Sequence, residues 1–456
     1  MTRPQDGPDG PENVAGPGRM NAGPPRIAAS GLPPGWSASL PFVLATLVPV
    51  PLLLAGALAG GLWVWLAALV PTLGVGLLDL LGRRVRAARP EAAGSDFPAG
   101  TGLSVALGLL HLPVLVLGVA AVGGLTGLAP AERAAMFLGV GVWLGQVSAA
   151  NAHELIHRPQ AALFRLGQMV YATLLFGHHV SAHRLVHHLH VATPADPNTA
   201  RRGEGVYRFF WRSFAGSWRA GLAAERRRIA MRQGARADRA AGIGHQVRNT
   251  VGEDPRARAA ARATSRNRQP PEPGAGPGMR AGSEAAEVPF LATPHAGYLA
   301  VAGLVVVLAA VAGLIAAGLP GALRTGGAAL ALGLYAASQV LVSDYVQHYG
   351  LRRARQEDGR HEPFGPAHAW NAPHPVSSAM MLHAPRHSDH HLHPLRPWPA
   401  LRLPAEDVAP RLPASLPAMG VLALLPPLWR RVMDPRLAAL AAARAPALPS
   451  GDAAEG

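Results

Sequence analysis

Three stretches of the chain concentrate histidine at spacings that suit metal binding. "HELIH" (153–157) puts two imidazoles four residues apart, and residues four apart share one face of a helix. "HHVSAHRLVHHLH" (178–190) and "HAPRHSDHHLH" (383–393) are denser, and "DYVQHYG" (344–350) adds one more histidine. Neutral imidazole is the commonest protein ligand for metals, so these clusters predict metal binding. The histidines at ligand spacing are His153, His157, His183, His187, His188, His348, His387, His390 and His391.

The absence of cysteine limits the chemistry that such a site can support. With no cysteine in 456 residues, disulfides, thiolate catalysis, cysteine-ligated zinc and iron–sulfur centres are excluded. Imidazole suits zinc, copper, iron and nickel. "HELIH" also fits H-E-x-x-H, the zinc protease helix in which glutamate is the general base, so an intramembrane zinc protease is an alternative. A protease needs only one further ligand, however, whereas nine ligands fit two metals with four or five each.

The elements that must position these histidines are membrane helices. The chain is 49% hydrophobic, mostly in long uncharged runs. A helix of about 20 apolar residues crosses the roughly 30 Å of hydrocarbon in a bilayer. We therefore predict an all-α integral membrane protein with about six transmembrane helices and a cytoplasmic histidine-rich domain. The predicted spans are 40–60, 62–81, 101–123, 134–152, 297–318 and 325–345.

Arginines set the predicted orientation of these spans. The formal charge is +15, and arginines follow the second and sixth spans and fill the loop between the fourth and fifth. Under the positive-inside rule, both termini and the histidine clusters lie on the cytoplasmic side of a bacterial-type inner membrane. Because the arginines alternate with apolar runs and form no single stripe, they predict contact with membrane lipids and no nucleic-acid partner.

Composition divides the chain into five regions. Residues 1–36 are rich in glycine and proline and predict a disordered tail. The first four spans and first two histidine clusters fall in 37–231, and the last two spans and third cluster in 291–435. Between them, 232–290 has no apolar periodicity and predicts a disordered insertion, while 436–456 predicts a flexible tail.

The clusters and their flanking residues carry a resemblance to a known family. They are "NAHELIHR" (151–158), "GHHVSAHRLVHHLHVATPADPNTARRGE" (177–204), "QHYGLRR" (347–353) and "AWNAPHPVSSAMMLHAPRHSDHHLHP" (369–394). The sequence resembles the membrane-bound alkane 1-monooxygenases, within the wider histidine-rich diiron family of integral-membrane desaturases and hydroxylases. "HYG" and "RHSDHH" are specific to the alkane hydroxylase branch, whereas desaturases share the three-cluster pattern loosely.

The resemblance implies an O2-dependent enzyme with two non-haem irons, held by the nine histidines named above. Its substrate would be a medium- or long-chain n-alkane, hydroxylated at the terminal methyl to a primary alcohol. Electrons would come from rubredoxin, which a rubredoxin reductase reduces. Carboxylates beside the ligands can accept an imidazole N–H and fix its orientation. The candidates for that role are Glu154, Asp196 and Asp389.

Substrate identity stays open at this point. The same site could act on an alkylaromatic, a terpene or a fatty acyl chain, as a hydroxylase or a desaturase. The family usually has Glu-His-Asn at the second cluster, where this chain has Ala182-His183-Arg184, so one possible supporting carboxylate is missing.

Small residues and isolated histidines within the spans have simpler interpretations. Gly139, Gly141 and Gly145 in the fourth span could make room for an alkyl chain, but packing contacts between helices are the favoured interpretation. His111 in the third span is expected to be a hydrogen-bonded bundle residue, and His295 a surface or loop residue.

Overall fold

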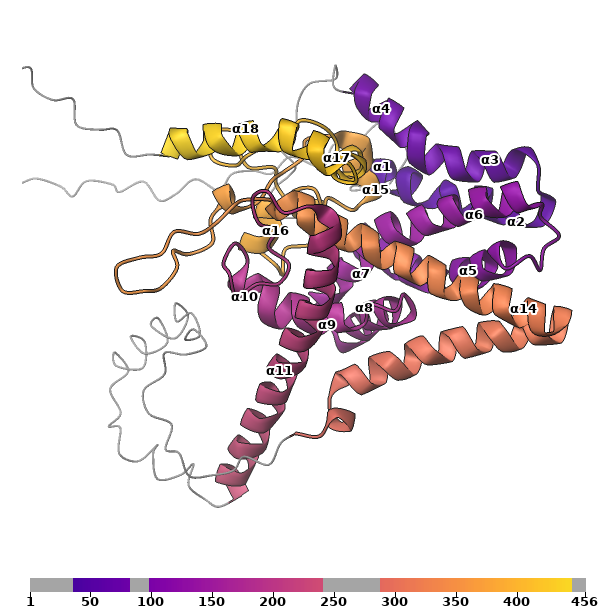
Figure 1. The fold of residues 1–456 in the computed structure, drawn as a ribbon, viewed down its shortest axis with the longest axis horizontal. Helices are drawn as coiled ribbons and strands as arrows, with labels where there is room; N and C mark the ends of the chain where they lie inside the picture. The colour runs from indigo at the N-terminus through magenta and orange to yellow at the C-terminus, as the bar shows by residue number, and fades with distance from the viewer. Residues whose placement is uncertain (1–35, 83–97, 241–287, 445–456) are drawn as a thin grey trace, which may run out of the picture.

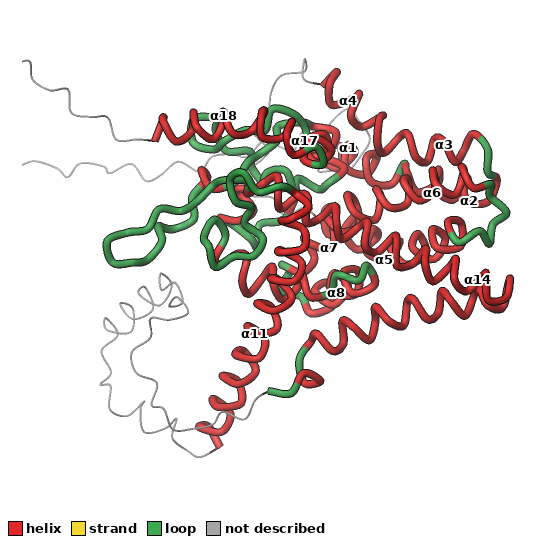
Figure 2. Tube along the Cα trace, in the orientation of Figure 1, coloured by secondary structure: helices red, strands yellow, loops and turns green. Residues whose placement is uncertain are grey.

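The computed structural model describes residues 36–82, 98–240 and 288–444. These residues form helices and loops, with two isolated bridges and no strand among them (Figure 2). The all-α prediction is therefore confirmed. Helices long and apolar enough to cross a membrane cover Ser39–Ala59, Leu62–Gly82, Gly100–Val122, Pro130–Ile156 and Pro294–His348.

The first four spans are assembled from shorter helical segments and agree with the four predicted spans to within a few residues. The fourth is the longest of them, because it begins at Pro130 and continues through "HELI" to Ile156. Their segments are α1 (Trp36–Leu47), α2 (Pro49–Ala59), α3 (Leu62–Leu69), η1 (Val70–Gly74), α4 (Val75–Gly82), α5 (Pro98–Val122), α6 (Pro130–Val142), η2 (Trp143–Ser148) and α7 (Ala149–Ile156).

The fifth span, α14 (Pro294–His348), is a hairpin of two helical arms. Its 55 residues would extend about 80 Å as one rod, far more than a bilayer needs. The helix breaks at Ala317 and Gly318, and Gly318 has φ 64°, a conformation that glycine adopts without steric cost. The Thr325 hydroxyl then donates to the Ala309 carbonyl of the other arm at 2.6 Å. The two arms lie side by side in Figure 1 and account for the predicted fifth and sixth spans.

The histidine-bearing segments gather at one end of the spanning helices (Figure 1). A short helix, α8, packs against α7, and the long α11 crosses the end of the bundle against α9 and α14. The segments between the fourth and fifth spans are α8 (Ala161–Thr173), α9 (His178–Ala182), η3 (His183–His187), α10 (His188–His190), α11 (Val206–Ala240) and η4 (Phe290–Ala292).

The C-terminal region caps the same end of the bundle. Here α17 packs against α14, and the Trp429 side chain of α18 is fully buried. The segments after α14 are η5 (Pro366–His368), α15 (Pro375–Met380), α16 (His387–Leu392), η6 (Trp398–Ala400), α17 (Leu416–Ala423) and α18 (Pro426–Arg444).

The predicted disordered insertion and the predicted flexible C-terminal tail each begin within a helix. The predicted insertion 232–290 begins inside α11, which continues to Ala240, and 241–287 lies outside the described residues. The predicted tail 436–456 begins inside α18, which continues to Arg444. The predicted N-terminal tail lies outside the described residues except for Trp36, which begins α1.

Candidate metal centre

The fold brings all nine candidate histidines together in two neighbouring groups. Within each group, one ligand nitrogen from every residue lies within 4.8 Å of all the others. Loops and helices far apart in the sequence supply each group. The first group is His153, His157, His183, His188 and His390, and the second is His187, His348, His387 and His391.

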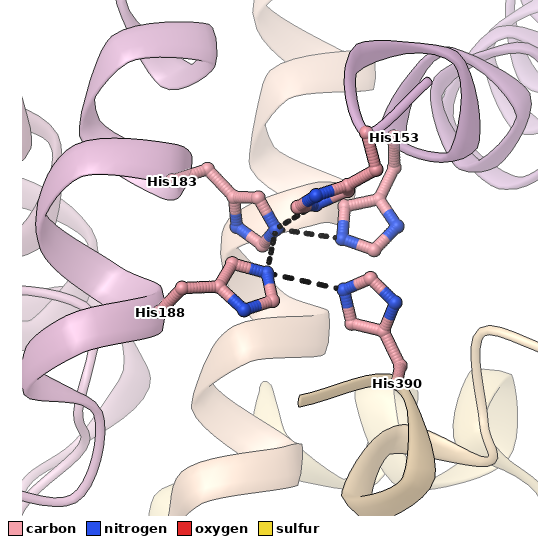
Figure 3. Close-up of side chains that lie close together, drawn as sticks. His153, His183, His188 and His390 are labelled. Atoms are coloured by element: carbon pink, nitrogen blue, oxygen red, sulfur yellow. Dashed lines mark hydrogen bonds between the residues drawn. The ribbon is translucent and has the colours of Figure 1, made fainter. Parts of the chain in front are cut away.

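In the first group the imidazole nitrogens converge on one point (Figure 3). His183 Nε2 lies 2.8 Å from His153 Nε2, 3.1 Å from His157 Nε2 and 2.9 Å from His188 Nε2. His390 Nε2 lies 3.2 Å from His188 Nε2. A neutral imidazole has only one N–H, so one nitrogen cannot form hydrogen bonds with three others in this way. Neighbouring ligands at about 2.1 Å from one ion would lie about 3 Å apart, which fits these distances.

The second group shows the same convergence with four residues. His387 Nε2 lies 2.9 Å from His348 Nε2 and 3.1 Å from His391 Nε2. His187 Nε2 is buried beside them without a hydrogen-bond partner. A buried polar atom that lacks a partner is costly, and a metal ion at this point would satisfy it. The donor set of both groups therefore fits a metal ion.

A π-helical turn divides the second histidine cluster between the groups. In η3 the backbone N–H of His188 bonds to the carbonyl of His183, five residues earlier. That turn brings His183 and His188 onto the same side of the helix, and both contribute to the first group. His187 points to the second group instead. π-helical turns are rare and occur often at functional sites.

The third cluster is held in place by the loop before it. The Asn371 amide donates to Ser388 Oγ at 2.8 Å, and the Ser388 N–H donates to Asn371 Oδ1 at 3.1 Å. These bonds fix the first turn of α16. His387 and His391, four residues apart, then share a face toward the second group, while His390 reaches the first.

Of the three candidate carboxylates, Asp196 contacts one of the nine histidines. Its Oδ2 accepts from His187 Nδ1 at 2.9 Å and from the Thr199 hydroxyl at 2.7 Å. Its Oδ1 accepts from the Asn198 N–H at 3.0 Å. This arrangement orients His187 Nε2 toward the second group, so the supporting role predicted for Asp196 has a geometric basis.

Glu154 and Asp389 contact other partners. Glu154 pairs with Arg158 and accepts from the Trp398 N–H at 3.2 Å. Asp389 pairs with Arg396 and accepts from the Arg402 N–H at 2.8 Å. Neither carboxylate is hydrogen-bonded to one of the nine histidines among the described residues, and a supporting role for Glu154 and Asp389 stays a prediction. Both instead fasten the loop that follows the third cluster.

Burial keeps most of these imidazoles in the neutral form that binds metal. For the residues beyond the spanning helices, desolvation and the neighbouring histidines lower the pKa well below the usual range. These residues are His157, His183, His188, His387, His390 and His391. His187 differs: burial opposes its protonation, but the Asp196 carboxylate, which is hydrogen-bonded to it, and the nearby Asp344 together raise the pKa.

A cavity of about 50 Å³ lies where the two groups meet the spanning helices. Its walls include His153 from the first group and His387 from the second, so an occupant would touch both. The other lining residues are Gly145, Ala149, Ala150, Tyr171, His179, Val340, Ser343, Asp344, Gln347, Met381 and Ala384.

Asp344 is a cavity residue that sequence reasoning missed. It lies one turn before His348 on α14, is 5% exposed, and accepts from Asn198 Nδ2 at 2.7 Å. A carboxylate inside an apolar span is rare and marks a functional position by default. The stretch "DYVQHYG" carries the sequence signal for this position, because its first residue is Asp344 within an apolar span.

Two histidines outside the nine have different outcomes. His111 is confirmed as a bundle residue, since its two ring nitrogens bond to Ser148 Oγ and Thr173 Oγ1, each at 2.7 Å. His295 was expected at the surface, but it is fully buried in α14 against Trp218. Arg184, which replaces an asparagine of the family pattern, lies over the Phe164 ring at 4.7 Å.

The glycines of the fourth span are packing contacts, as favoured from the sequence. A Cβ on Gly139 would lie 2.6 Å from the Ala67 carbonyl oxygen. A Cβ on Gly141 would meet the Tyr335 ring, and one on Gly145 the Gln339 amide.

The chain is similar to known proteins over most of its length. Residues 129–251 and 271–423, more than half of the sequence, match the family model described as fatty acid desaturase. Alkane 1-monooxygenase of Pseudomonas putida is 29% identical over 307 residues, which cover 67% of this chain and 60% of that protein. Against this relative, therefore, the chain spans less than two thirds of its length.

Other relatives align over more of both chains. Alkane 1-monooxygenase 1 of Pseudomonas aeruginosa is 29% identical over 388 residues, 82% of this chain and 84% of that protein. The xylene/toluene monooxygenase hydroxylase component XylM of Pseudomonas putida is 25% identical over 374 residues, 81% of each chain.

Proposed function

Because the chain belongs to the fatty acid desaturase family, we propose that each of its two histidine groups holds one iron ion and that the protein is a membrane monooxygenase. The observation that carries this proposal is the convergence of nine imidazoles into groups of five and four beside one cavity. Five and four neutral nitrogen donors suit divalent iron among the metals that imidazole binds. The nine histidines are accordingly proposed as the iron ligands.

The proposed reaction converts a terminal methyl and O2 into a primary alcohol and water, consuming two electrons and two protons. A bound pair of redox-active irons would supply the activation of O2. The protein's own residues would orient the metal ligands and keep competing reactants away from the site. Asp196 holds His187 in one tautomer, Asn371 holds α16, and the cavity beside the two histidine groups gives a place for the reacting carbon.

The proposed substrate is a medium- or long-chain n-alkane. Relatives named alkane 1-monooxygenase support this choice, and the lining of the cavity by Gly, Ala, Val and Met suits an unbranched chain end. The relative named for xylene and toluene supports a second candidate, the methyl group of an alkylaromatic. Both candidates share oxidation of a methyl group.

The proposed electron donor is rubredoxin, reduced by a rubredoxin reductase, acting at the cytoplasmic end of the bundle. The chain has no cysteine to ligate an electron-transfer centre of its own. The positive-inside distribution of arginine supports the cytoplasmic placement of the histidine groups.

A zinc protease is less well supported. In that alternative the glutamate of "HELIH" acts as general base on a metal-bound water. Glu154 is instead committed to Arg158 and the Trp398 N–H. The two histidines of that motif also share their group with three others.

The first test is metal content of the detergent-solubilised protein, followed by product analysis. We expect two irons per chain, and a primary alcohol from an n-alkane when O2, rubredoxin, its reductase and NADH are supplied. One zinc per chain with little iron would refute the oxygenase proposal. Two irons per chain, a benzylic alcohol from xylene and no alcohol from alkanes would instead support the alkylaromatic substrate.

A further inference from the structure

The cavity beside the histidines is too small for a whole alkyl chain. About 10–15 Å³ of such volume holds one water-sized group, so about 50 Å³ holds roughly four of them. The rest of a medium- or long-chain substrate must extend out of the cavity. One path out of the cavity leads toward the middle of the membrane, along the fourth span and the second arm of α14, which both line it.

Two glutamines lie on that side, directly behind the cavity residue Gly145, where a Cβ would collide with Gln339 Nε2. Gln339 lies one turn before the cavity residue Ser343 on α14. Its Nε2 donates to the Gly141 carbonyl of the fourth span at 2.8 Å. Gln146 Nε2 in turn donates to Gln339 Oε1 at 3.0 Å. The amide of Gln339 is thus held across the space between the two helices.

Small residues on the fourth span allow the Gln339 side chain to lie close against it. Gly145 lines the cavity, and a Cβ there would collide with the Gln339 amide. One turn further into the membrane, Gly141 faces Tyr335, which stacks on Phe137 at 5.2 Å between ring centroids. Without the Gln339 side chain, the space over Gly145 would extend the cavity toward Tyr335.

This pair of glutamines is unusual for its surroundings. An interhelical hydrogen bond inside a bilayer contributes only about 0.6 kcal/mol on average, so packing alone does not require two amides here. Gln146 Oε1 is also buried without a hydrogen-bond partner, which is costly in a span. A polar pair of this kind calls for a role other than stability.

We propose that Gln339, held by Gln146, limits the length of alkyl chain that can lie with its methyl at the histidines. This inference rests on the proposed function and names the residue that would set its chain-length preference. Removing the Gln339 side chain opens about one helical turn, about 5.4 Å or roughly four methylene groups. Gln339→Ala should therefore shift the preferred n-alkane toward longer chains.

The absence of native cysteine allows a test that needs neither iron nor turnover. Ala149, a buried cavity residue, is replaced in Ala149→Cys to give a single reactive thiol. The full-length protein in lipid vesicles is treated with alkyl methanethiosulfonates of increasing chain length, and labelling rates are read by mass spectrometry. With Gln339→Ala added, the rate for long relative to short reagents should rise by about tenfold or more.

Two further variants make the result specific. Gln146→Leu removes the donor that holds Gln339 while keeping similar bulk, and should give a smaller shift in the same direction. Gln168→Ala is the matched control. Gln168 donates to the Tyr298 hydroxyl, at a contact between two other helical segments, so its removal should leave the length profile unchanged. Iron content equal to the unmodified protein, measured without Ala149→Cys, confirms that each variant is folded.

The outcomes separate this inference from the proposed function. An unchanged length profile in Gln339→Ala, or no labelling at any chain length in either background, would overturn the role of Gln339. A shifted labelling profile in a protein that oxidises no alkane would support that role and refute alkane oxidation. Where alkanes are oxidised, Gln339→Ala should also shift the product distribution from a mixed-length alkane pool toward longer alcohols.

Discussion

Replacing Asp196 with asparagine tests whether this carboxylate holds the second histidine group in place. The carboxylate accepts from His187 Nδ1, the Thr199 hydroxyl and the Asn198 N–H, and it is 2% exposed. An asparagine has only one acceptor oxygen. If that oxygen faces His187 and Thr199, the new NH2 meets the Asn198 N–H. If it faces Asn198, His187 loses its acceptor.

Either orientation has a cost whose size follows from these contacts. A buried donor without a partner costs about 1–3 kcal/mol. Removing the hydrogen-bond partner of a ligating histidine lowers metal affinity by about 10–100-fold, or about 1.4–2.7 kcal/mol. We therefore expect Asp196→Asn to weaken iron binding in the second group, to which His187 belongs, and to leave the first group loaded.

The assay is iron retention after dialysis against a graded series of chelator concentrations, with Mössbauer spectra of iron-57 to separate the two sites. Asp389→Asn makes the same chemical change in a carboxylate that pairs with Arg396, and should show no selective loss from the second group. The reasoning is refuted if Asp196→Asn keeps both irons at the original chelator concentrations. It is equally refuted if both sites empty together.

Three further predictions address the ligands and the helix packing. His183→Ala should empty the first site and His391→Ala the second, each leaving the other iron in the same Mössbauer measurement; simultaneous loss in both variants would contradict the division into two groups. His111→Leu removes the bonds to Ser148 and Thr173 and should lower the free energy of unfolding by about 0.6–1.7 kcal/mol, with iron content unchanged, as measured by chemical unfolding in detergent. Gly321→Val places a side chain against the facing arm of α14, where overpacking costs about 1–3 kcal/mol; an unaltered melting temperature would show that the arms do not depend on this close approach.

The membrane helices could be predicted because the bilayer itself imposes their length and apolar composition. Where a chain crosses lipid as helices, each crossing needs about 20 mostly apolar residues, so each predicted span reappears in the structure. The hairpin in α14 could also be predicted from the sequence, because only a short segment containing Gly318 and Pro320 separates the predicted fifth and sixth spans.

The membership of each histidine group could not be predicted from spacing. Spacing arguments assume 3.6 residues per turn, and on that basis His183 and His187 share a face. The π-helical turn of η3 changes the register, so His183 is grouped with His188 instead. The partners of Glu154 and Asp389 depend on arginines brought near by the fold, and the sequence carries no signal for which acid meets an imidazole.

The presence of Met381 in the cavity wall has a consequence for the working life of the protein. Its side chain is 4% exposed and lies in the same small cavity as His153 and His387. A thioether is readily oxidised to a sulfoxide, which is polar and bulkier. Under the proposed function, activation of O2 while the cavity is empty would put Met381, the methionine in its lining, at risk of oxidation. The sulfoxide formed on Met381 would then occupy part of the cavity that the proposed substrate needs. Substrate binding would therefore be lost before the metal is lost.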